Sequence, residues 1–257
     1  MICFLILAHY AEDVLQDQVN NIRRLVPGSK VIVYNGGLDP DFGKNCSVDV
    51  CPKSSFVQKP KLARVLYDTM CWLEEMDENY DYLVYIDSDM LFINDGFEAY
   101  IEKLMLNHDC IALYLRKIDE LDPNAWWGPA RTMWQEWERW KSFFGTDYFM
   151  GCLNAMQLFR RSIVQKMLSS FNSDELEELL LHTDVYALEE IVHVTLAARC
   201  GARYRTYPKE CEEYVILDRS LTVEDIQVAI TKKDVYFVHP ISRDITDEAR
   251  VWINQNV

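Results

Sequence analysis

The first 115 residues alternate short, continuous apolar runs with segments whose apolar residues recur at helical spacing. The apolar runs lie at residues 2–7, 30–34, 82–86 and 110–115, and the helical segments between them at 12–25, 61–76 and 97–106. An apolar run without a polar face is typical of a strand covered on both sides, and alternating helices supply that cover. The pattern predicts a parallel, doubly wound α/β sheet, in which ligands bind at the carboxyl ends of the strands.

The second half of the chain has a less regular pattern. We expect strands at residues 151–159, 203–207 and 235–238, and helices at 161–171, 184–200 and 222–231. Neither a linker rich in Pro, Gly or Ser nor an internal repeat separates the two halves, 1–115 and 116–257. The sequence therefore predicts a single domain over residues 1–257.

Charge limits the partners that the chain can bind. The sequence has 41 acidic and 26 basic residues, which gives a formal net charge of −15. Binding to a nucleic-acid backbone needs Lys and Arg to displace counterions, so we expect no nucleic-acid partner. An anionic ligand must then be held by a metal ion, a helix N-terminus or a few basic side chains.

Residues 1–10 are apolar but have neither a basic n-region nor a small-residue cleavage site, so we expect a core strand there and no signal peptide. No apolar run reaches the roughly 18 residues needed to cross a bilayer, and we expect no transmembrane segment. The eight Cys are scattered without CxxC spacing, so we expect reduced thiols and a cytoplasmic protein. No pattern in the sequence specifies an oligomeric state.

The tripeptide Asp87-Ser88-Asp89 directly follows the apolar run at 82–86. Within a regular strand the two carboxylates would point to opposite faces, but at a strand end the chain turns and both can reach one cation. Hard cations such as Mg²⁺ and Mn²⁺ prefer carboxylate oxygens and take further ligands from substrate phosphates. Asp and Ser are also common in turns and caps, which is the favoured interpretation of an isolated tripeptide. The place of this one, at the end of the third strand of a βαβ series, favours a metal site.

With these features the sequence resembles the nucleotide-diphospho-sugar glycosyltransferases of the GT-A type, in which an Asp-x-Asp follows a buried strand. The opening Phe4-Leu5-Ile6-Leu7-Ala8-His9 and the segment Lys61-Leu62-Ala63-Arg64 add to the likeness, which covers residues 1–115 well and the rest loosely. The resemblance implies a GT-A-like (Rossmann-like) α/β fold with a mixed, mostly parallel sheet flanked by helices. It also implies that residues 1–115 bind a nucleotide-sugar donor and residues 116–257 bind the acceptor.

The resemblance further implies a Mn²⁺ or Mg²⁺ site. Asp89 would bind the metal, and Asp87 would face the ribose or a metal-bound water. His239, at the end of an expected strand, is the candidate for a third ligand, although a lone His beside an apolar run is more often structural. The donor-binding candidates are Ala8, His9, Tyr10, Asn35, Lys61, Arg64, Asp87, Ser88, Asn154 and Arg243.

Sugar transfer with inversion needs a carboxylate that accepts the proton of the acceptor hydroxyl. The pair Glu189-Glu190, followed by an apolar helical stretch, resembles the acidic pair of inverting GT-A enzymes, and Asp184 is the competing candidate. Paired Glu on a helix is ordinarily a solvated face, and Asp184 fits an N-cap equally well. Catalytic and structural interpretations both stay open for these three residues.

Five of the seven Trp lie between residues 119 and 147. Large aromatic side chains most often pack a core, but flat rings also stack on sugars. We expect this stretch to bind the acceptor through Trp126, Trp127 and Trp134.

The predicted function is metal-dependent transfer of a sugar, with inversion, from a nucleotide-diphosphate donor to a hydroxyl of a small-molecule or glycan acceptor; a UDP-sugar is the first donor to consider. A retaining transferase on the same fold would need no separate base. A sugar nucleotidyltransferase would need a Gly-rich, basic loop after the first strand, and residues 8–12 (AHYAE) do not form one. A non-catalytic binding module would keep the aspartates as caps.

Overall fold

The computed structural model describes residues 1–57, 62–122 and 125–257. Within these residues, seven strands form the central sheet in the order β10-β6-β9-β4-β1-β2-β3. Their bounds are β1 (Ile2–Ala8), β2 (Lys30–Asn35), β3 (Asp49–Val50), β4 (Tyr82–Asp87), β6 (Cys110–Ala112), β9 (Gln157–Arg160) and β10 (Tyr204–Thr206). Of these strands, only β9 runs antiparallel to its neighbours, β4 and β6. The expected mixed, mostly parallel sheet is confirmed.

The middle strands of the sheet are buried on both faces. In β1, Cys3 and Leu5 pack into the hydrophobic cluster on one side of the sheet, and Phe4 and Ile6 pack into the cluster on the other. Successive side chains of a strand point to opposite faces, so a strand covered twice needs apolar residues at every position. This explains why the sequence of β1 is a continuous apolar run.

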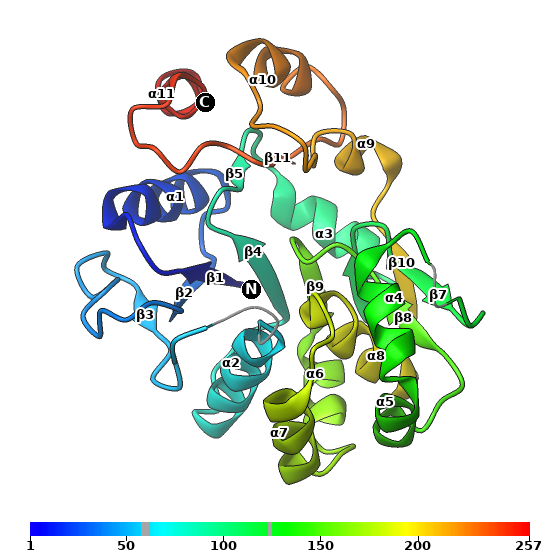
Figure 1. Ribbon diagram of the computed structural model, residues 1–257. Helices are drawn as coiled ribbons and strands as arrows, with labels where there is room; N and C mark the ends of the chain where they lie inside the picture. Colours follow the sequence, from blue (N-terminus) through cyan, green and yellow to red (C-terminus); the bar gives the residue numbers. More distant parts are fainter. Residues whose placement is uncertain (58–61, 123–124) are drawn as a thin grey trace.

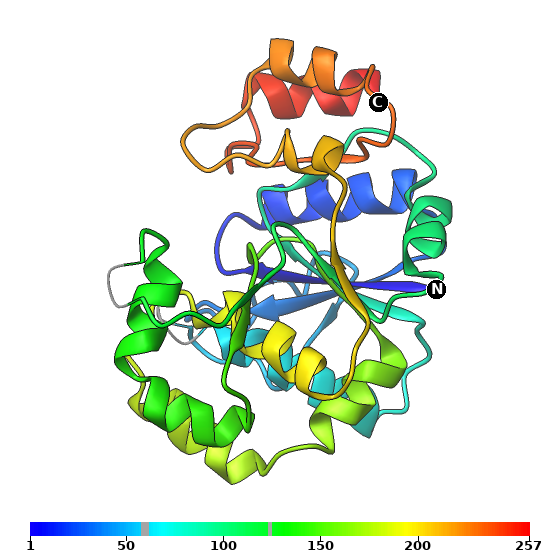
Figure 2. The ribbon, with the colours of Figure 1, turned by 90° about the vertical axis from the view of Figure 1, so that its right-hand side faces the viewer.

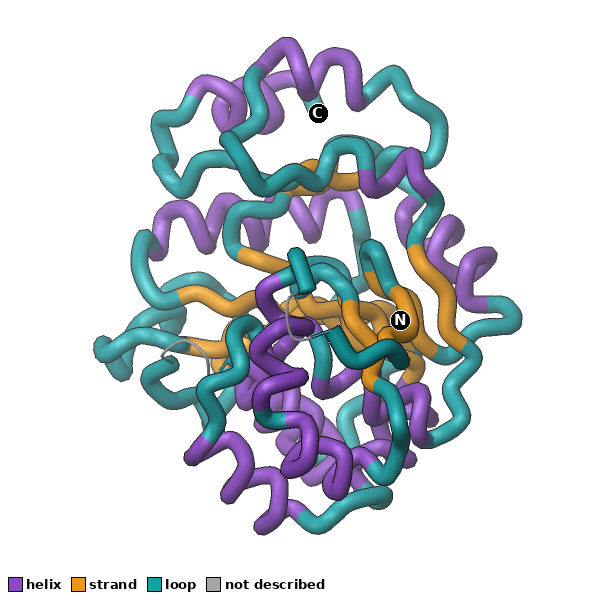
Figure 3. Tube along the Cα trace, turned by 45° about the vertical axis from the view of Figure 1, so that its right-hand side comes forward, coloured by secondary structure: helices purple, strands orange, loops and turns teal. Residues whose placement is uncertain are grey.

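Helices cover both faces of the sheet (Figure 1; Figure 3 shows the strands between the helices). One face is covered by α1 (Glu12–Leu25) and α3 (Phe97–Met105). The other is covered by α2 (Ala63–Glu75), α6 (Arg161–Leu168) and α8 (Val192–Arg199), and this layer is extended by α4 (Gly128–Gln135), α5 (Trp137–Phe144) and α7 (Ser173–His182). The hairpin of β7 (Arg116–Ile118) and β8 (Phe149–Gly151) leads into and out of α4 and α5.

A further, C-terminal layer lies beyond α1, away from the sheet (Figure 2). It contains α9 (Lys209–Glu212), α10 (Val223–Ala229) and α11 (Glu248–Asn256), and β11 (Phe237–Val238) pairs antiparallel with β5 (Leu91–Phe92). Ile226, Val238 and Ile253 belong to the separate hydrophobic cluster of this layer. Because β5 follows β4 after a short turn, the β5–β11 pair brings residue 239 beside the end of β4.

Two expected elements are wrong. The single strand at 151–159 is two strands in different sheets: β8 ends at Gly151, and β9 begins at Gln157 after Met156, whose φ is +61°. The helix at 184–200 is interrupted at Ala187, with φ +48°, so that the short 3₁₀ helix η1 (Leu188–Glu190) precedes α8. A left-handed residue that is not Gly leaves no mark in the pattern of apolar spacing.

Among the described residues, no helix has the length and apolarity that a membrane span requires. The side chains of all eight Cys are free thiols.

Candidate active site

The turn that follows β4 is held by hydrogen bonds from α1. The side-chain amide of Gln18, fully buried on the apolar face of α1, donates to the carbonyl oxygens of Asp87 at 2.7 Å and Met90 at 2.8 Å. The N–H of Met90 donates to the Asp87 carbonyl at 3.1 Å, which closes the turn. Because the backbone polar groups face α1, the side chains of Asp87 and Asp89 are free to face the other way.

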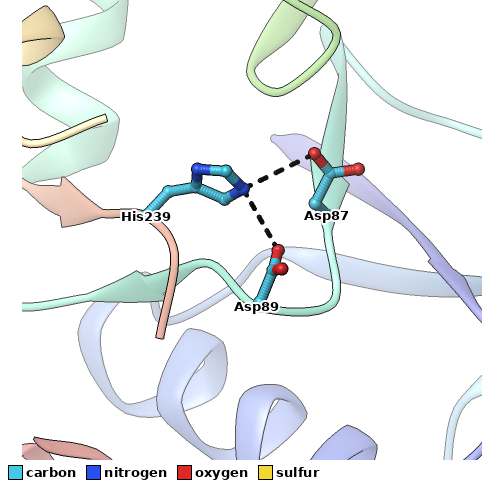
Figure 4. A group of neighbouring side chains, drawn as sticks. All are labelled: Asp87, Asp89 and His239. Atoms are coloured by element: carbon cyan, nitrogen blue, oxygen red, sulfur yellow. Dashed lines mark ion pairs between the residues drawn. The ribbon is translucent and has the colours of Figure 1, made fainter. Parts of the chain in front are cut away.

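The C-terminal layer places a histidine and an arginine against these carboxylates. The N–H of Ile241 donates to the Asp89 carbonyl at 2.7 Å and so fixes this segment on the turn. The His239 Nε2 atom lies 3.2 Å from Asp89 Oδ1 and 3.9 Å from Asp87 Oδ2 (Figure 4). Arg243 Nη2 lies 2.9 Å from Asp89 Oδ2.

The charges of this group shift its pKa values in different directions. Burial and the neighbouring charge of Asp89 raise the pKa of Asp87. Burial alone would also raise the pKa of Asp89, but the hydrogen bond and charge of His239, together with Arg243, outweigh it and lower that pKa. Burial would lower the pKa of His239, and the two aspartates reverse this and raise it. The two carboxylates thus stabilise a positive charge placed between them, here that of His239.

Asp87, Asp89 and His239 also fit a divalent cation. One possible ligand atom from each lies within 4.8 Å of the others, and this is the one such group of His, Cys, Asp or Glu within residues 1–57, 62–122 and 125–257. Carboxylates suit Mg²⁺ and Mn²⁺, and an imidazole favours Mn²⁺, the softer of the two. With a cation held by these three residues, other coordination positions would remain open to a ligand.

A cavity of about 750 Å³ opens beside this group at the carboxyl ends of β1, β2 and β4. Its walls include His9 after β1, Asp87 and Asn154, both glutamates of η1, Arg243, and the apolar side chains of Leu7, Phe56, Leu62 and Tyr186. A volume of this size accommodates a ligand as large as a nucleotide-sugar.

The loop after β2 shapes one wall of the cavity. Asn35 is buried, and its side chain donates to the carbonyl of Asp39 at 2.7 Å and accepts from the N–H of Gly37 at 2.9 Å. A Cβ at Gly37 would lie 2.8 Å from the carbonyl oxygen of His9, so only glycine fits here. Asn35 therefore shapes the loop, and Gly36, Gly37 and Asp39 line the cavity beside it.

Glu190 lines the same cavity as Asp87. Burial raises the pKa of Glu190 to about 7, and the charge of Asp87 acts in the same direction. The backbone N–H of Asn154, the charge of Arg116 and a hydrogen bond from the Trp127 side chain partly oppose this shift. A carboxyl that titrates near neutral pH beside a cavity is suited to accept a proton.

Glu189 and Asp184 are placed differently. Glu189 also lines the cavity, but it is 7% exposed and its carbonyl accepts from the Gln157 side chain at 2.9 Å. Asp184 is exposed, and its N–H donates to Glu136 Oε1 at 2.7 Å, away from the residues that line the cavity. Of the three candidates for a base, the structure brings the two glutamates to the site and leaves Asp184 outside it.

The donor-binding candidate Arg64 is not among the residues that line the cavity. Arg64 forms ion pairs with Glu177 and, at 3.5 Å, with Asp68, and it lines a separate groove against α7. Lys61 lies outside the described residues. The contacts of Arg64 are thus with carboxylates on α2 and α7, and its role in donor binding stays a prediction.

Ala8, Tyr10 and Ser88 do not line the cavity, but each is next in the chain to His9 or Asp87, which do. Ala8 is buried, and its carbonyl accepts from the N–H of Gly36 at 2.9 Å. Tyr10 is half exposed and hydrogen bonds to Arg243, and Ser88 is partly exposed in the turn. The Asn154 side chain lies 3.4 Å from Asp87 Oδ1, so Asn154 contacts both the first aspartate and Glu190.

The three tryptophans expected to bind the acceptor lie in three different environments. Trp134 is 7% exposed and packs against Trp137 and Phe149, with ring centroids 5.1 and 4.7 Å apart. Its ring thus packs in the core, and its expected contact with an acceptor stays a prediction. Trp126 is 87% exposed, and Trp127 is partly buried beside Glu190.

Sequence reasoning missed several residues of the site. Gln18 gave a signal, since a polar residue on the apolar face of a helix needs a buried partner. Phe56, Tyr186 and Arg116 gave none, because each comes from a loop or a strand edge whose position depends on the fold.

The similarity of this chain to known proteins lies in its fold. No protein-family model matches the sequence, and no curated protein matches it. Among solved structures, an active-site mutant of LgtC aligns with a TM-score of 0.50 over 98% of this chain and 94% of its own, at 13% identity. The galactosyltransferase LgtC in complex with donor and acceptor sugar analogs covers 98% and 94% at 12% identity, with a TM-score of 0.46.

A glycosyltransferase involved in the glycosylation of the major capsid of PBCV-1 aligns over 100% of this chain and 99% of its own, with a TM-score of 0.48 and 12% identity. At such low identity, similarity of this kind establishes the fold alone. The chain has the fold of the GT-A glycosyltransferases, a mostly parallel sheet flanked by helices.

Proposed function

We propose that the protein is a metal-dependent glycosyltransferase. It moves a sugar from a nucleoside-diphosphate donor, first of all a UDP-sugar, to a hydroxyl of a small-molecule or glycan acceptor. The observation that carries this proposal is the convergence of Asp87, Asp89 and His239 beside a cavity of about 750 Å³ at the carboxyl ends of the central strands. A sugar nucleotidyltransferase and a binding module share the fold class, but neither needs a second buried carboxylate, that of Glu190, in the same cavity as Asp87.

Each part of the site has a role in this proposal. When bound by Asp87, Asp89 and His239, Mn²⁺ or Mg²⁺ would neutralise charge that develops on the departing diphosphate. Arg243 lies on the same cavity wall and adds a fixed positive charge. The loop with Gly36 and Gly37 forms a wall of the cavity for the nucleoside, and it packs so closely on Leu7 and His9 that a Cβ at either position would lie 2.8 Å from one of them.

Glu190 is the base in this proposal. It lines the same cavity as Asp87, and its raised pKa lets it accept a proton from an acceptor hydroxyl near pH 7. Glu190→Gln should lower turnover by about 10²- to 10⁴-fold with little change in donor affinity. Turnover that survives this substitution would favour a retaining enzyme, and the anomeric configuration of the product, read by NMR, decides between the two outcomes.

The site as a whole is tested with a panel of UDP- and GDP-sugars, with Mn²⁺, with Mg²⁺ and with EDTA. We expect metal-dependent release of nucleotide with at least one donor. Asp89→Asn should weaken Mn²⁺ binding, measured by calorimetry, at least about 100-fold. Asp95→Asn, which changes an exposed carboxylate six residues along the chain, is the matched control and should bind Mn²⁺ like the wild type. No nucleotide release with any donor would refute the proposal.

We infer a cytoplasmic location. Eight free thiols support a reducing compartment, where disulfides do not persist.

A further inference from the structure

A second cavity, of about 450 Å³, lies beside the proposed site. The edge strand β7 and the segment before α4 form one side, and the segment after α9 forms the other; Figure 2 shows that last segment as an orange loop. The residues that matter here are Arg116, Trp126, Trp127, Val215, Ile216 and Leu217. None of them has a role in holding the metal or the donor in the function proposed above.

The walls of this second cavity are mainly apolar. Of its lining side chains, only those of Arg116 and Asp218 carry charge. Leu217 is 73% exposed and Trp126 is 87% exposed, so two large apolar side chains face solvent at one opening. The Arg116 guanidinium lies 4.5 Å from the ring centre of Trp127 and 5.9 Å from that of Trp126, which orders the two rings.

One wall connects the second cavity to the proposed base. The Trp127 side chain lines the second cavity and donates a hydrogen bond to Glu190, which lines the first. A Cβ at Gly151 would lie 2.6 Å from the Trp127 ring, so the ring is held closely against the end of β8. The neighbouring Cys152 donates its N–H to the Glu190 carbonyl at 3.0 Å.

The other wall connects the second cavity to the metal-ligand group. Val215 forms a parallel bridge with His239, and the N–H of Ile216 donates to the His239 carbonyl at 2.9 Å. The second cavity is therefore connected to the proposed base through Trp127 and to the metal-ligand group through the backbone of His239. Trp127 places the second cavity next to the carboxyl group of Glu190.

We propose that the second cavity binds an apolar aglycone, an aryl or alkyl group attached to the acceptor whose hydroxyl faces Glu190. This proposal rests on the proposed function. A sugar ring carries a hydroxyl on almost every carbon and needs several hydrogen-bonding partners, whereas the lining of this cavity has two charged side chains. Its Tyr114 hydroxyl and Cys152 thiol already donate to the carbonyls of Glu212 and Glu190. An aryl or alkyl group needs no hydrogen-bonding partner, and it covers the apolar surface of Trp126 and Leu217.

The test uses 4-methylumbelliferyl glycosides of several sugars as fluorescent probes, with binding read by fluorescence anisotropy. We expect the wild type to bind these probes, free 4-methylumbelliferone to compete, and the matching methyl glycosides not to compete at equal concentration. Trp126→Ala and Leu217→Ser should each weaken probe binding about tenfold. Leu106→Ser, which changes a leucine 76% exposed at the end of α3, is the matched control and should bind the probe unchanged.

Metal-dependent nucleotide release by the same variants separates this inference from the proposed function. We expect Leu217→Ser to release nucleotide from the donor like the wild type, because Leu217 does not line the donor cavity. Probe binding that is absent, or unchanged in both variants, overturns the aglycone site and leaves the transferase standing. Nucleotide release that is absent in every variant, wild type included, overturns the transferase and with it the acceptor role of this cavity.

Discussion

Glu190 couples the stability of the protein to pH. Burial raises its pKa from the ordinary 4.5 to about 7, so between these values the folded protein holds a proton that the unfolded chain has lost. The contribution of Glu190 to the free energy of unfolding therefore falls as pH rises through this window, by at most about 3 kcal/mol. The loss is complete once the pH exceeds the folded-state pKa.

Glu190→Gln removes this dependence, because the amide does not titrate. We expect the wild type to lose stability relative to Glu190→Gln between pH 5 and pH 8, as measured by urea unfolding in EDTA. Comparing the two proteins at each pH cancels every other titrating group. Parallel stability curves for the two would show that Glu190 has an ordinary pKa.

The residues of the site differ in how far the sequence revealed them. Asp87 and Asp89 could be placed at a strand end because the apolar run at 82–86 predicts where that strand ends. Glu190 could be named as acidic near an apolar helix, but its burial and its contacts with Asn154 and Trp127 come from segments far apart in the sequence. Local patterns specify where a strand stops, whereas a raised pKa depends on what the fold packs around the group.

At the scale of elements, α1 holds β5, the strand that follows the turn with Asp87 and Asp89. The buried Asn21 side chain donates to the Phe92 carbonyl at 2.9 Å and accepts from the Phe92 N–H at 2.8 Å, so it pairs with β5 as a neighbouring strand would. Asn21→Ala leaves both backbone groups of Phe92 buried without these bonds. We expect the free energy of unfolding to fall by about 2–4 kcal/mol.

Asn20→Ala is the matched control for Asn21→Ala, since Asn20 lies on the same helix and is exposed. Thermal or urea unfolding of the two variants measures the difference. Equal destabilisation of both variants would mean that helix propensity, and not the bonds to β5, sets the effect.

The elements that the sequence predicted well are those with a local signature. The apolar runs of β1, β2 and β4 and the helix at 12–25 are confirmed. β9 could not be placed, because its antiparallel insertion between β4 and β6 is a long-range choice, and its few residues, Gln157–Arg160, follow a left-handed Met156. The interruption at Ala187 could not be predicted either, because its left-handed backbone leaves no mark in the apolar pattern. Glu189 and Glu190 follow it and line the cavity.

At the scale of the whole molecule, the site depends on the attachment of the C-terminal layer to the sheet. His239 and Arg243 come from that layer, and Asp87 and Asp89 come from the end of β4. The attachment has a buried ionic centre: the fully buried Arg250 of α11 donates to Asp17 Oδ2 of α1 at 2.6 Å. Arg250 also donates twice to the carbonyl of Ser242, at 3.0 and 3.1 Å.

Arg250 therefore anchors the segment of residues 239–243 that faces Asp89. Arg250→Met should lower the free energy of unfolding by about 3–5 kcal/mol, because it leaves the largely buried Asp17 without its counter-charge. It should also weaken Mn²⁺ binding in the fraction that stays folded, because Ser242 loses the donor that fixes it. Arg250→Lys keeps the charge and should recover part of both losses.

Thermal unfolding with and without Mn²⁺ measures both effects. At a Mn²⁺ concentration of about 100 times Kd, the wild type should gain about 2.7 kcal/mol, which for a domain of this size raises Tm by roughly 5–10 °C. Arg250→Met should gain less at the same concentration. Arg219→Met removes a solvent-exposed ion pair with Asp225 in the same layer and should keep the full Mn²⁺ response. A full response in Arg250→Met would show that Arg250 stabilises the layer without positioning His239 and Arg243, because loss of stability alone does not reduce the gain from a ligand that binds the native state.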